Sequence, residues 1–131
     1  MSSYSLKKIG LKAVSFSSPG SDFKPDDKIG VSINRDHSEP DEQGEFEVIV
    51  SVEITPANLE DALVAVTYFG IFQYSEEPKN LKFKEFATIN APAIIFPYIR
   101  QFVRSVTLEA GLNPIILPIV NFVDLQPENE E

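Results

Sequence analysis

Apolar and polar residues alternate in several stretches of this chain, and each such stretch predicts a β-strand. In residues 4–16 the alternation breaks near Gly10, which predicts a bulge or bend there. Residues 29–34 alternate cleanly, as a half-buried strand does. Residues 45–54 place Phe46, Val48, Val50, Val52 and Ile54 on one face, whereas Glu45, Glu47, Ser51 and Glu53 face water and Ile49 is the exception.

A fourth stretch, residues 62–74, is apolar on both faces. An antiparallel sheet normally keeps one face in water. We therefore expect one face of this strand to take a helix and the other to meet a partner surface, because it is too apolar to stay bare. The two expected faces are Val64, Val66, Tyr68 and Phe72 on one side, and Leu63, Phe69 and Ile71 on the other.

A long helix is predicted between Asn90 and Gly111. Asn90 has the chemistry of an N-cap, and Pro92 falls in the first turn, where its missing N–H is harmless. Gly111 is the expected stop signal. Pro97, in the middle, removes one helical hydrogen bond and is expected to kink the helix.

Apolar residues occupy more of this helix than one sheet can cover. One face repeats at steps of three and four residues, as a core-facing stripe does, and consists of Ile95, Ile99, Phe102 and Val106. A second apolar row runs beside it. We expect this second row to meet another subunit; it consists of Ile94, Tyr98 and Leu108.

The remaining stretches connect or flank these elements. Residues 35–44 are expected to form a charged surface loop between two hairpin strands. Residues 76–89, called the lid here, predict a short helix with four large apolar side chains. Residues 112–122 contain two prolines in an apolar run and are expected to be extended and docked. We expect one domain over residues 1–126 and an acidic, disordered tail over 127–131.

Composition narrows the functional classes. The chain has 131 residues, a formal net charge of −9 and no cysteine, so it has no thiolate zinc site, disulfide or cysteine nucleophile. The acid excess argues against nucleic acid as a partner. No apolar run approaches the length of a membrane span, and the N-terminus lacks the apolar core of a signal peptide. A cytoplasmic protein without membrane insertion is expected.

Chemistry-bearing motifs are sparse. His37 is the single histidine and lies among acidic residues, but catalytic zinc needs two or three nitrogen or sulfur ligands. We expect a surface histidine on a mobile loop. The carboxylates of the strand 45–54 are explained by its wet face, and no phosphate-binding or nucleophile motif is present. The sequence predicts no catalytic residue, no cofactor and no metal, and thus not an enzyme.

Residues 91–103 read APAIIFPYIRQFV, and a spaced apolar run follows through Pro118 and Phe122. On these residues, the stretch 91–122 resembles the SecB family of protein-export chaperones. Upstream, FGIF at 69–72 matches the end of that family's fourth strand. Val14, Ser15, Phe16 and Pro19 match its first strand and the proline that follows.

The resemblance implies an α+β fold, with a four-stranded antiparallel sheet and one long helix, assembled as a homodimer or homotetramer. It also implies an ATP-independent chaperone, or holdase, that binds unfolded or export-bound polypeptides in an apolar groove. By position, the candidate client-binding residues are Phe69, Ile71, Phe72, Leu81, Phe83 and Phe86.

This chain departs from the family pattern in two ways. The acidic positions through which family members dock the SecA motor correspond here to Ala13, Ser17 and Ala65, so SecA docking is doubtful. The family's second helix is expected to be short or absent, because Pro127 soon follows Val123 and Asp124. Both departures leave an alternative open: an oligomeric protein of the same fold dedicated to one partner, for example an antitoxin, and not to general export.

Overall fold

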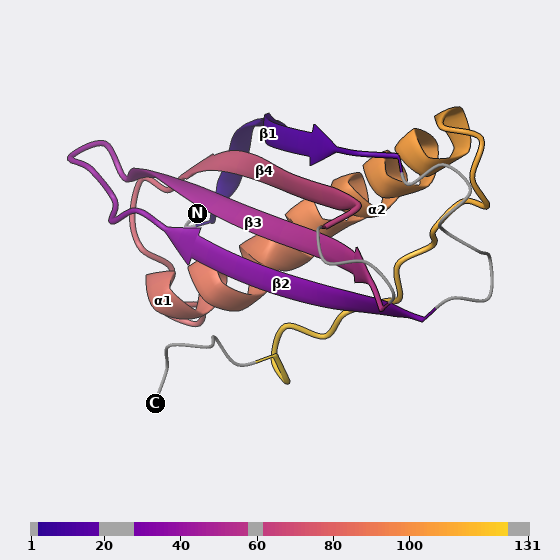
Figure 1. Ribbon diagram of the computed structural model, residues 1–131. Helices are drawn as coiled ribbons and strands as arrows, with labels where there is room; N and C mark the ends of the chain where they lie inside the picture. The colour runs from indigo at the N-terminus through magenta and orange to yellow at the C-terminus, as the bar shows by residue number, and fades with distance from the viewer. Residues whose placement is uncertain (1–2, 19–27, 58–61, 126–131) are drawn as a thin grey trace.

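A four-stranded antiparallel sheet forms one layer of the structure, and one long helix lies across one of its faces (Figure 1). The computed structural model describes residues 3–18, 28–57 and 62–125. The strands are β1 (Ser5–Phe16), β2 (Ile29–His37), β3 (Glu45–Pro56) and β4 (Val64–Gln73), in the spatial order β1-β4-β3-β2. The expected α+β class, with its sheet and long helix, is confirmed.

Strand β1 carries two irregularities, one on each side of the glycine where one was expected. The register with β4 shifts between Leu6 and Lys8 and again between Leu11 and Ala13, so Lys7 and Lys12 are the extra residues. Gly10 itself pairs with Phe69, and a Cβ atom at Gly10 would lie 3.2 Å from the Phe69 ring. The glycine therefore serves to seat that ring against the strand.

Strand β2 is longer than its alternation indicated. It extends to His37, so residues 35–37 belong to the strand and the expected loop shortens to residues 38–44. The alternation is hidden because the charged residues Arg35 and Asp36 continue the strand. Strand β3 also runs two residues beyond its predicted end, to Pro56.

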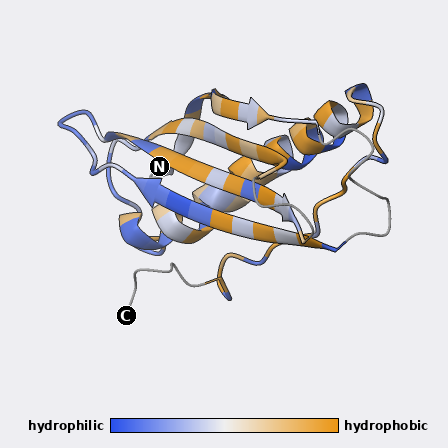
Figure 2. Ribbon diagram, viewed as in Figure 1, coloured by the Kyte–Doolittle hydropathy of each residue, from blue (hydrophilic) through white to orange (hydrophobic). Residues whose placement is uncertain are grey.

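The core lies between β3, β4 and the helix α2 (Ala91–Glu109). From Phe46 to Ile54, every second residue of β3 is at most 2% exposed, and these residues are hydrophobic, as the colouring of the strand in Figure 2 shows. Burying each such side chain contributes about 1.5–3 kcal/mol. Leu63, expected on the opposite face, is 1% exposed and belongs to this core because it precedes β4 and is not part of it. The helix contributes Ala91, Ile95, Phe96, Ile99 and Val103.

The long helix begins earlier than predicted. Asn90 is not an N-cap: its backbone is helical, at φ −73° and ψ −45°, and its side chain makes no capping hydrogen bond. The helical run starts after the extended residue Lys82, with α1 (Phe83–Glu85) and the π-helical turn η2 (Phe86–Asn90). Buried Phe86 and Ala87 anchor that turn to the core, so the predicted short helix and the long helix are continuous.

Two prolines lie within this helical run. The π-helical turn ends two residues before Pro92, whose ring would press on the carbonyl four residues earlier in a regular helix. Ala91 donates to the Phe86 carbonyl, five residues back, as a π turn requires. Pro97 lies inside α2, as expected. The bend of the helix axis at Pro97 stays a prediction.

A glycine terminates the helical run after α2, as predicted. Gly111 has φ +81°, its N–H donates to the Leu108 carbonyl, and the N–H of Leu112 donates to the carbonyl of Thr107. These two bonds form a Schellman motif. The chain then turns back and runs extended beneath β2 (Figure 1), with Ile115, Leu117 and Phe122 buried.

The structure therefore confirms the expected extended, docked segment. Through residue 125, where the described part of the chain ends, no helix follows α2. This agrees with the expected short or absent C-terminal helix. The predicted acidic tail, residues 127–131, lies outside the described residues.

Thr107 joins α2 to the C-terminal segment, and its replacement tests that joint. Its hydroxyl is fully buried, donates to the Val103 carbonyl (2.8 Å) and accepts the N–H of Ile115 (3.0 Å). Thr107→Val keeps the shape but leaves that N–H unpaired, so we expect unfolding free energy to fall by about 1–3 kcal/mol in urea titrations. The Ile115 amide should exchange hydrogen faster, whereas Thr107→Ser should keep it protected. Equal protection in the valine variant would contradict this role.

Candidate functional site

The structure distributes the six candidate client-binding residues over three places. Phe72 and Phe86 are buried in the core, at 1% and 6% exposure, with ring centroids 5.2 Å apart. Leu81 and Phe83 are half-buried on the lid. Phe69 and Ile71 are half-buried on the opposite face of the sheet, because neighbouring residues of a strand point to opposite faces. The six residues therefore do not form one surface.

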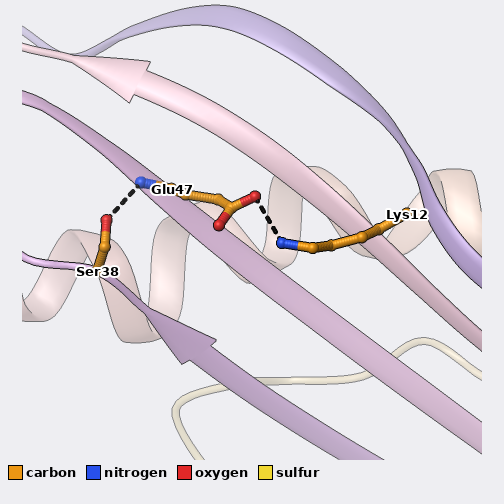
Figure 3. A network of polar contacts seen from close by, with 3 residues as sticks. All are labelled: Lys12, Ser38 and Glu47. Carbon is orange, nitrogen blue, oxygen red and sulfur yellow. Dashed lines mark hydrogen bonds and ion pairs between the residues drawn. The ribbon is translucent and has the colours of Figure 1, made fainter.

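The sheet face that α2 does not cover is mixed in character. Phe69 packs beside Gly10, and the Lys8 ammonium lies 6.0 Å from the Phe69 ring centroid. Lys12 crosses β4 to reach Glu47, with 3.0 Å between Nζ and Oε2 (Figure 3). This exposed ion pair contributes at most about 1 kcal/mol. The expected apolar second face is thus reduced to a small patch among charged and polar side chains.

Glu47 also shows how β2 is tied to this face. Its backbone N–H donates to the Ser38 hydroxyl over 2.9 Å, in addition to the ion pair with Lys12 (Figure 3). Ser51 and Thr67 share a hydrogen bond of 2.8 Å between their hydroxyls. Polar contacts therefore link β1, β3 and β4 on the outer face, and they join β3 to Ser38, the residue that follows β2, in agreement with the expected wet face of β3.

Tyr4, which the sequence interpretation did not single out, anchors the lid. Its hydroxyl donates to the Leu81 carbonyl over 2.7 Å, and its ring stacks on Phe86 with centroids 3.9 Å apart. Burial, and secondarily the charge of Glu77, raise the pKa of Tyr4 to about 12. In the sequence, the sign of this role was an aromatic residue immediately before the first strand, in a chain that has many other aromatic residues. Tyr4 ties β1 to a segment 77 positions away.

A second set of contacts runs along the helix-facing side of β2. We call it the β2 margin and define it by five half-buried residues: Ile33, Arg35, His37, Phe83 and Leu125. The His37 ring meets the Phe83 ring edge-on, with centroids 5.2 Å apart. His37 is the last residue of β2, so the prediction of a histidine on a mobile loop is wrong.

Arg35 is the cation of the β2 margin. Its guanidinium donates to the main-chain carbonyls of Phe122 (3.3 Å) and Leu125 (2.6 Å), and its carbon lies 5.4 Å from the Phe122 ring centroid. The Phe122 ring in turn contacts Phe96 of α2, with centroids 5.9 Å apart. One arginine thereby holds the turn at residues 122–124 by its backbone and by its aromatic side chain. The sequence placed Arg35 in a loop, so this role was missed.

The expected outer row of α2 is exposed. Ile94, Tyr98 and Leu108 have exposures of 41%, 46% and 52%. The Tyr98 ring lies 6.4 Å from that of Tyr68 on β4, and Tyr68 pairs with Leu11 of β1. Tyr68 thus stands between the outer row of α2 and the apolar residues of β1. We call this set of residues the β1–α2 strip; it consists of Leu6, Leu11, Val14, Tyr68, Ile94, Tyr98, Phe102 and Leu108.

The described part of the chain contains no group of three or more histidine, aspartate or glutamate side chains arranged to hold a metal ion. Within the same ranges, no helix combines the length and hydropathy needed to cross a membrane.

Comparison with known families decides the identity of this fold. The family described as preprotein translocase subunit SecB matches the chain over residues 1–131. The chain belongs to the SecB family. A protein-export protein SecB from Aromatoleum aromaticum is 32% identical over 129 residues, covering 93% of this chain and 80% of that protein. An uncharacterized protein of Methanocaldococcus jannaschii is 32% identical over 114 residues, covering 81% and 72%.

A solved structure agrees with a SecB fold. A SecB-like chaperone of Mycobacterium tuberculosis, solved in complex with a peptide from an antitoxin, superposes with a TM-score of 0.72 over 90% of this chain and 88% of that one. Its sequence identity is 18%, so the likeness shows the fold alone. Ala13, Ser17 and Ala65 are the uncharged positions named above for SecA docking, and Ala13 and Ser17 are exposed. Ala13 and Ala65 lie on the sheet face that α2 leaves open. The same face carries Glu45, Glu47 and Glu53.

The pH dependence of Tyr4 is testable. Because its folded-state pKa of about 12 lies above the ordinary tyrosine value of 10.0, the folded protein favours the neutral phenol. This contribution to stability is complete below pH 10 and is lost as pH rises towards 12. We expect ultraviolet titration of the folded protein to show a late tyrosine ionisation that Tyr4→Phe removes. Tyr98→Phe is the exposed control. Loss of an ordinary ionisation step in Tyr4→Phe would contradict the assignment.

Proposed function

We propose that this SecB family member is an ATP-independent holdase that binds unfolded polypeptides in the cytoplasm. The observation that carries the proposal is the half-exposed apolar surface formed by the lid and the β2 margin. Phe83 stands at its centre: it packs edge-on against Phe46 (4.8 Å) and His37 (5.2 Å), so the ring is held in place and part of it remains accessible. A fixed aromatic surface suits apolar clients because little side-chain entropy is lost on binding.

Client recognition on this surface needs no catalytic residue or cofactor. Leu81 and Phe83 offer apolar contact, and the lid is already tied down through Tyr4 and through the Phe83 N–H, which donates to the Glu77 carboxylate over 2.8 Å. Individual contacts of this kind are weak. They add along a client that touches several copies of the site in one oligomer, since each further contact is intramolecular.

Self-association supplies that multivalency, and we propose the β1–α2 strip as its interface. Apolar patches of this kind are rarely left open on soluble monomers. Ile94, Tyr98 and Leu108 extend along one side of α2, and Leu6, Leu11 and Val14, each 43% exposed, lie on β1. A homodimer or homotetramer built on this strip would bury the outer row of the helix and leave the β2 margin open for clients.

A second candidate function is that of a chaperone dedicated to one partner. It is favoured by the Mycobacterium tuberculosis SecB-like chaperone, whose structure contains an antitoxin peptide. The uncharged Ala13, Ser17 and Ala65 also favour it, because we propose that SecA docking is weak without carboxylates there. The two functions differ in breadth: a general holdase protects unrelated unfolded proteins, whereas a dedicated one protects a single client.

The decisive experiment follows light scattering as a guanidinium-unfolded model enzyme is diluted with and without this protein, in the absence of nucleotide. We expect suppression near a stoichiometric ratio. Phe83→Asp places a charge in the proposed client surface and should raise the concentration for half-suppression about tenfold or more, as hot-spot residues do. Thermal unfolding by circular dichroism confirms that the variant is folded.

Two further variants sharpen this test. Lys84→Asp introduces the same acid at the exposed neighbouring position and should leave suppression unchanged. Phe69→Asp examines the outer face of the sheet. Suppression that falls for Phe69→Asp but not for Phe83→Asp would move the client site to that face. Failure of the wild type with several unrelated enzymes would overturn the general holdase in favour of the dedicated partner.

The oligomer has a separate prediction. Tyr98→Asp puts a charge in the middle of the β1–α2 strip, so sedimentation analysis should show a smaller particle than the wild type at the same concentration. Gln101→Asp, an exposed polar position on the same helix, should keep the wild-type mass. A wild-type protein that sediments as a monomer would remove the interface from the proposal.

A further inference from the structure

A row of aromatic rings crosses the helix-facing side of the sheet, from the residue before β1 to the last residue of β2. The Tyr4 ring lies 6.2 Å from that of Phe46, measured between centroids. Phe46 in turn contacts Phe83 at 4.8 Å, and Phe83 contacts His37 at 5.2 Å. All three contacts are edge-on, which is a favourable arrangement for aromatic pairs. The row therefore joins both edges of the sheet through the ring at the centre of the proposed client surface.

Tyr4, at one end of this row, also holds the lid on both sides of that ring. Its hydroxyl donates to the carbonyl of Leu81, two positions before Phe83. Its ring stacks on Phe86, three positions after Phe83. The bond from the Phe83 N–H to Glu77 lies within the lid itself, so it does not attach the lid to the sheet. Tyr4 provides that attachment from the side of β1.

Strand β1 brings Tyr4 next to the proposed subunit interface. Leu6 pairs with Phe72, which is buried in the core, so Leu6 points to the helix-facing side, because paired residues of neighbouring strands share a face. Tyr4, two residues earlier, lies on the same side, as its contacts with Phe46 and Phe86 show. Leu6 belongs to the β1–α2 strip, whereas Tyr4 is half-buried against the lid. The interface and the lid thus meet at neighbouring positions.

In a single subunit, β1 is held by few buried contacts. It is an edge strand that pairs with β4 alone, and its register is interrupted twice. Its apolar residues Leu6, Leu11 and Val14 are all exposed. Elements with few buried apolar contacts open locally more often than a core does. A partner subunit on the β1–α2 strip would cover these side chains and make the opening of β1 rarer.

We propose that Tyr4 is a positioning residue through which subunit assembly holds the client surface in place. The inference rests on the proposed function and on its interface. When β1 opens, the Leu81 carbonyl and the Phe86 ring lose Tyr4, and the lid that carries Phe83 is held less firmly. Assembly that keeps β1 closed therefore keeps the lid closed as well. The oligomer then supplies more than multivalency, because it also fixes each client ring.

Hydrogen exchange tests this link by comparing the assembled protein with Tyr98→Asp, whose subunits are expected to separate. The readouts are two lid amides: that of Phe83, bonded to Glu77, and that of Phe86, bonded to the Lys82 carbonyl over 3.0 Å. We expect both to exchange about three- to tenfold faster in the separated subunits, the value of one hydrogen bond. Amides of β3 are the reference, since a general loss of stability would speed them too. Dilution of the wild-type protein gives the same comparison without a substitution.

Tyr4→Phe distinguishes a positioning role from a merely structural one. It keeps the ring and loses the hydrogen bond to Leu81, so the difference between assembled and separated subunits should fall below about twofold. A merely structural tyrosine would speed exchange by the same factor in both states. Ser5→Ala is the matched control: it removes another hydroxyl-to-carbonyl bond at this end of β1, that to Gln73, and should leave the response of the lid unchanged.

Three outcomes would overturn the inference, and each is distinct from a failure of the holdase. Lid amides that exchange equally fast in assembled and separated subunits would remove the link and leave the interface intact. A response to assembly that persists unchanged in Tyr4→Phe would assign the link to another contact. A wild-type protein that sediments as a monomer would overturn the inference together with the interface. Suppression of light scattering reports the holdase independently of all three.

Discussion

The contact between α2 and the apolar face of β3 and β4 is the interaction on which the rest of this structure depends. Val48, Val50, Val52 and Ile54 of β3 are at most 1% exposed, and the helix meets them with Ile95, Ile99 and Val103. A single helix has one covering stripe, whereas the sheet has four strands. The central strands are therefore sealed, and both edges of the sheet are left partly open. That geometry produces the two surfaces on which function is proposed.

The two open edges of the sheet, β1 and β2, differ in their surroundings and in their regularity. Beside β1, the uncovered area is apolar and continues onto the outer row of α2, while the strand edge itself is bulged and rich in lysine. Beside β2, the C-terminal segment fills part of the space through Phe122 and Arg35, and the strand edge is regular. The first arrangement suits side-chain packing between subunits. The second suits contact with apolar client side chains, because the Phe83 ring is held in place there and remains partly accessible.

Sequence periodicity predicted the elements well where one face alone is buried. The four strands, the glycine stop at Gly111 and the docked C-terminal segment were all foreseen, because each leaves a local pattern. Predictions that depended on tertiary contacts were less accurate. Asn90 has the chemistry of a cap, but the burial of Phe86 continues the helix past it. Phe72 and Phe86 were candidates for client contact, but both are buried in the core. Arg35 and Tyr4 act through partners about 75 to 90 positions away, which no local pattern encodes.

Native mass spectrometry of this protein mixed with an unfolded, carboxymethylated client tests the central claim most directly, since it reports self-association and client capture in one spectrum. The account predicts a dimer or tetramer that carries one client chain without any nucleotide. Dissociated subunits, or an intact oligomer that carries none of several unrelated clients, would contradict it. The first result would remove the β1–α2 strip as an interface, and the second would remove the general holdase.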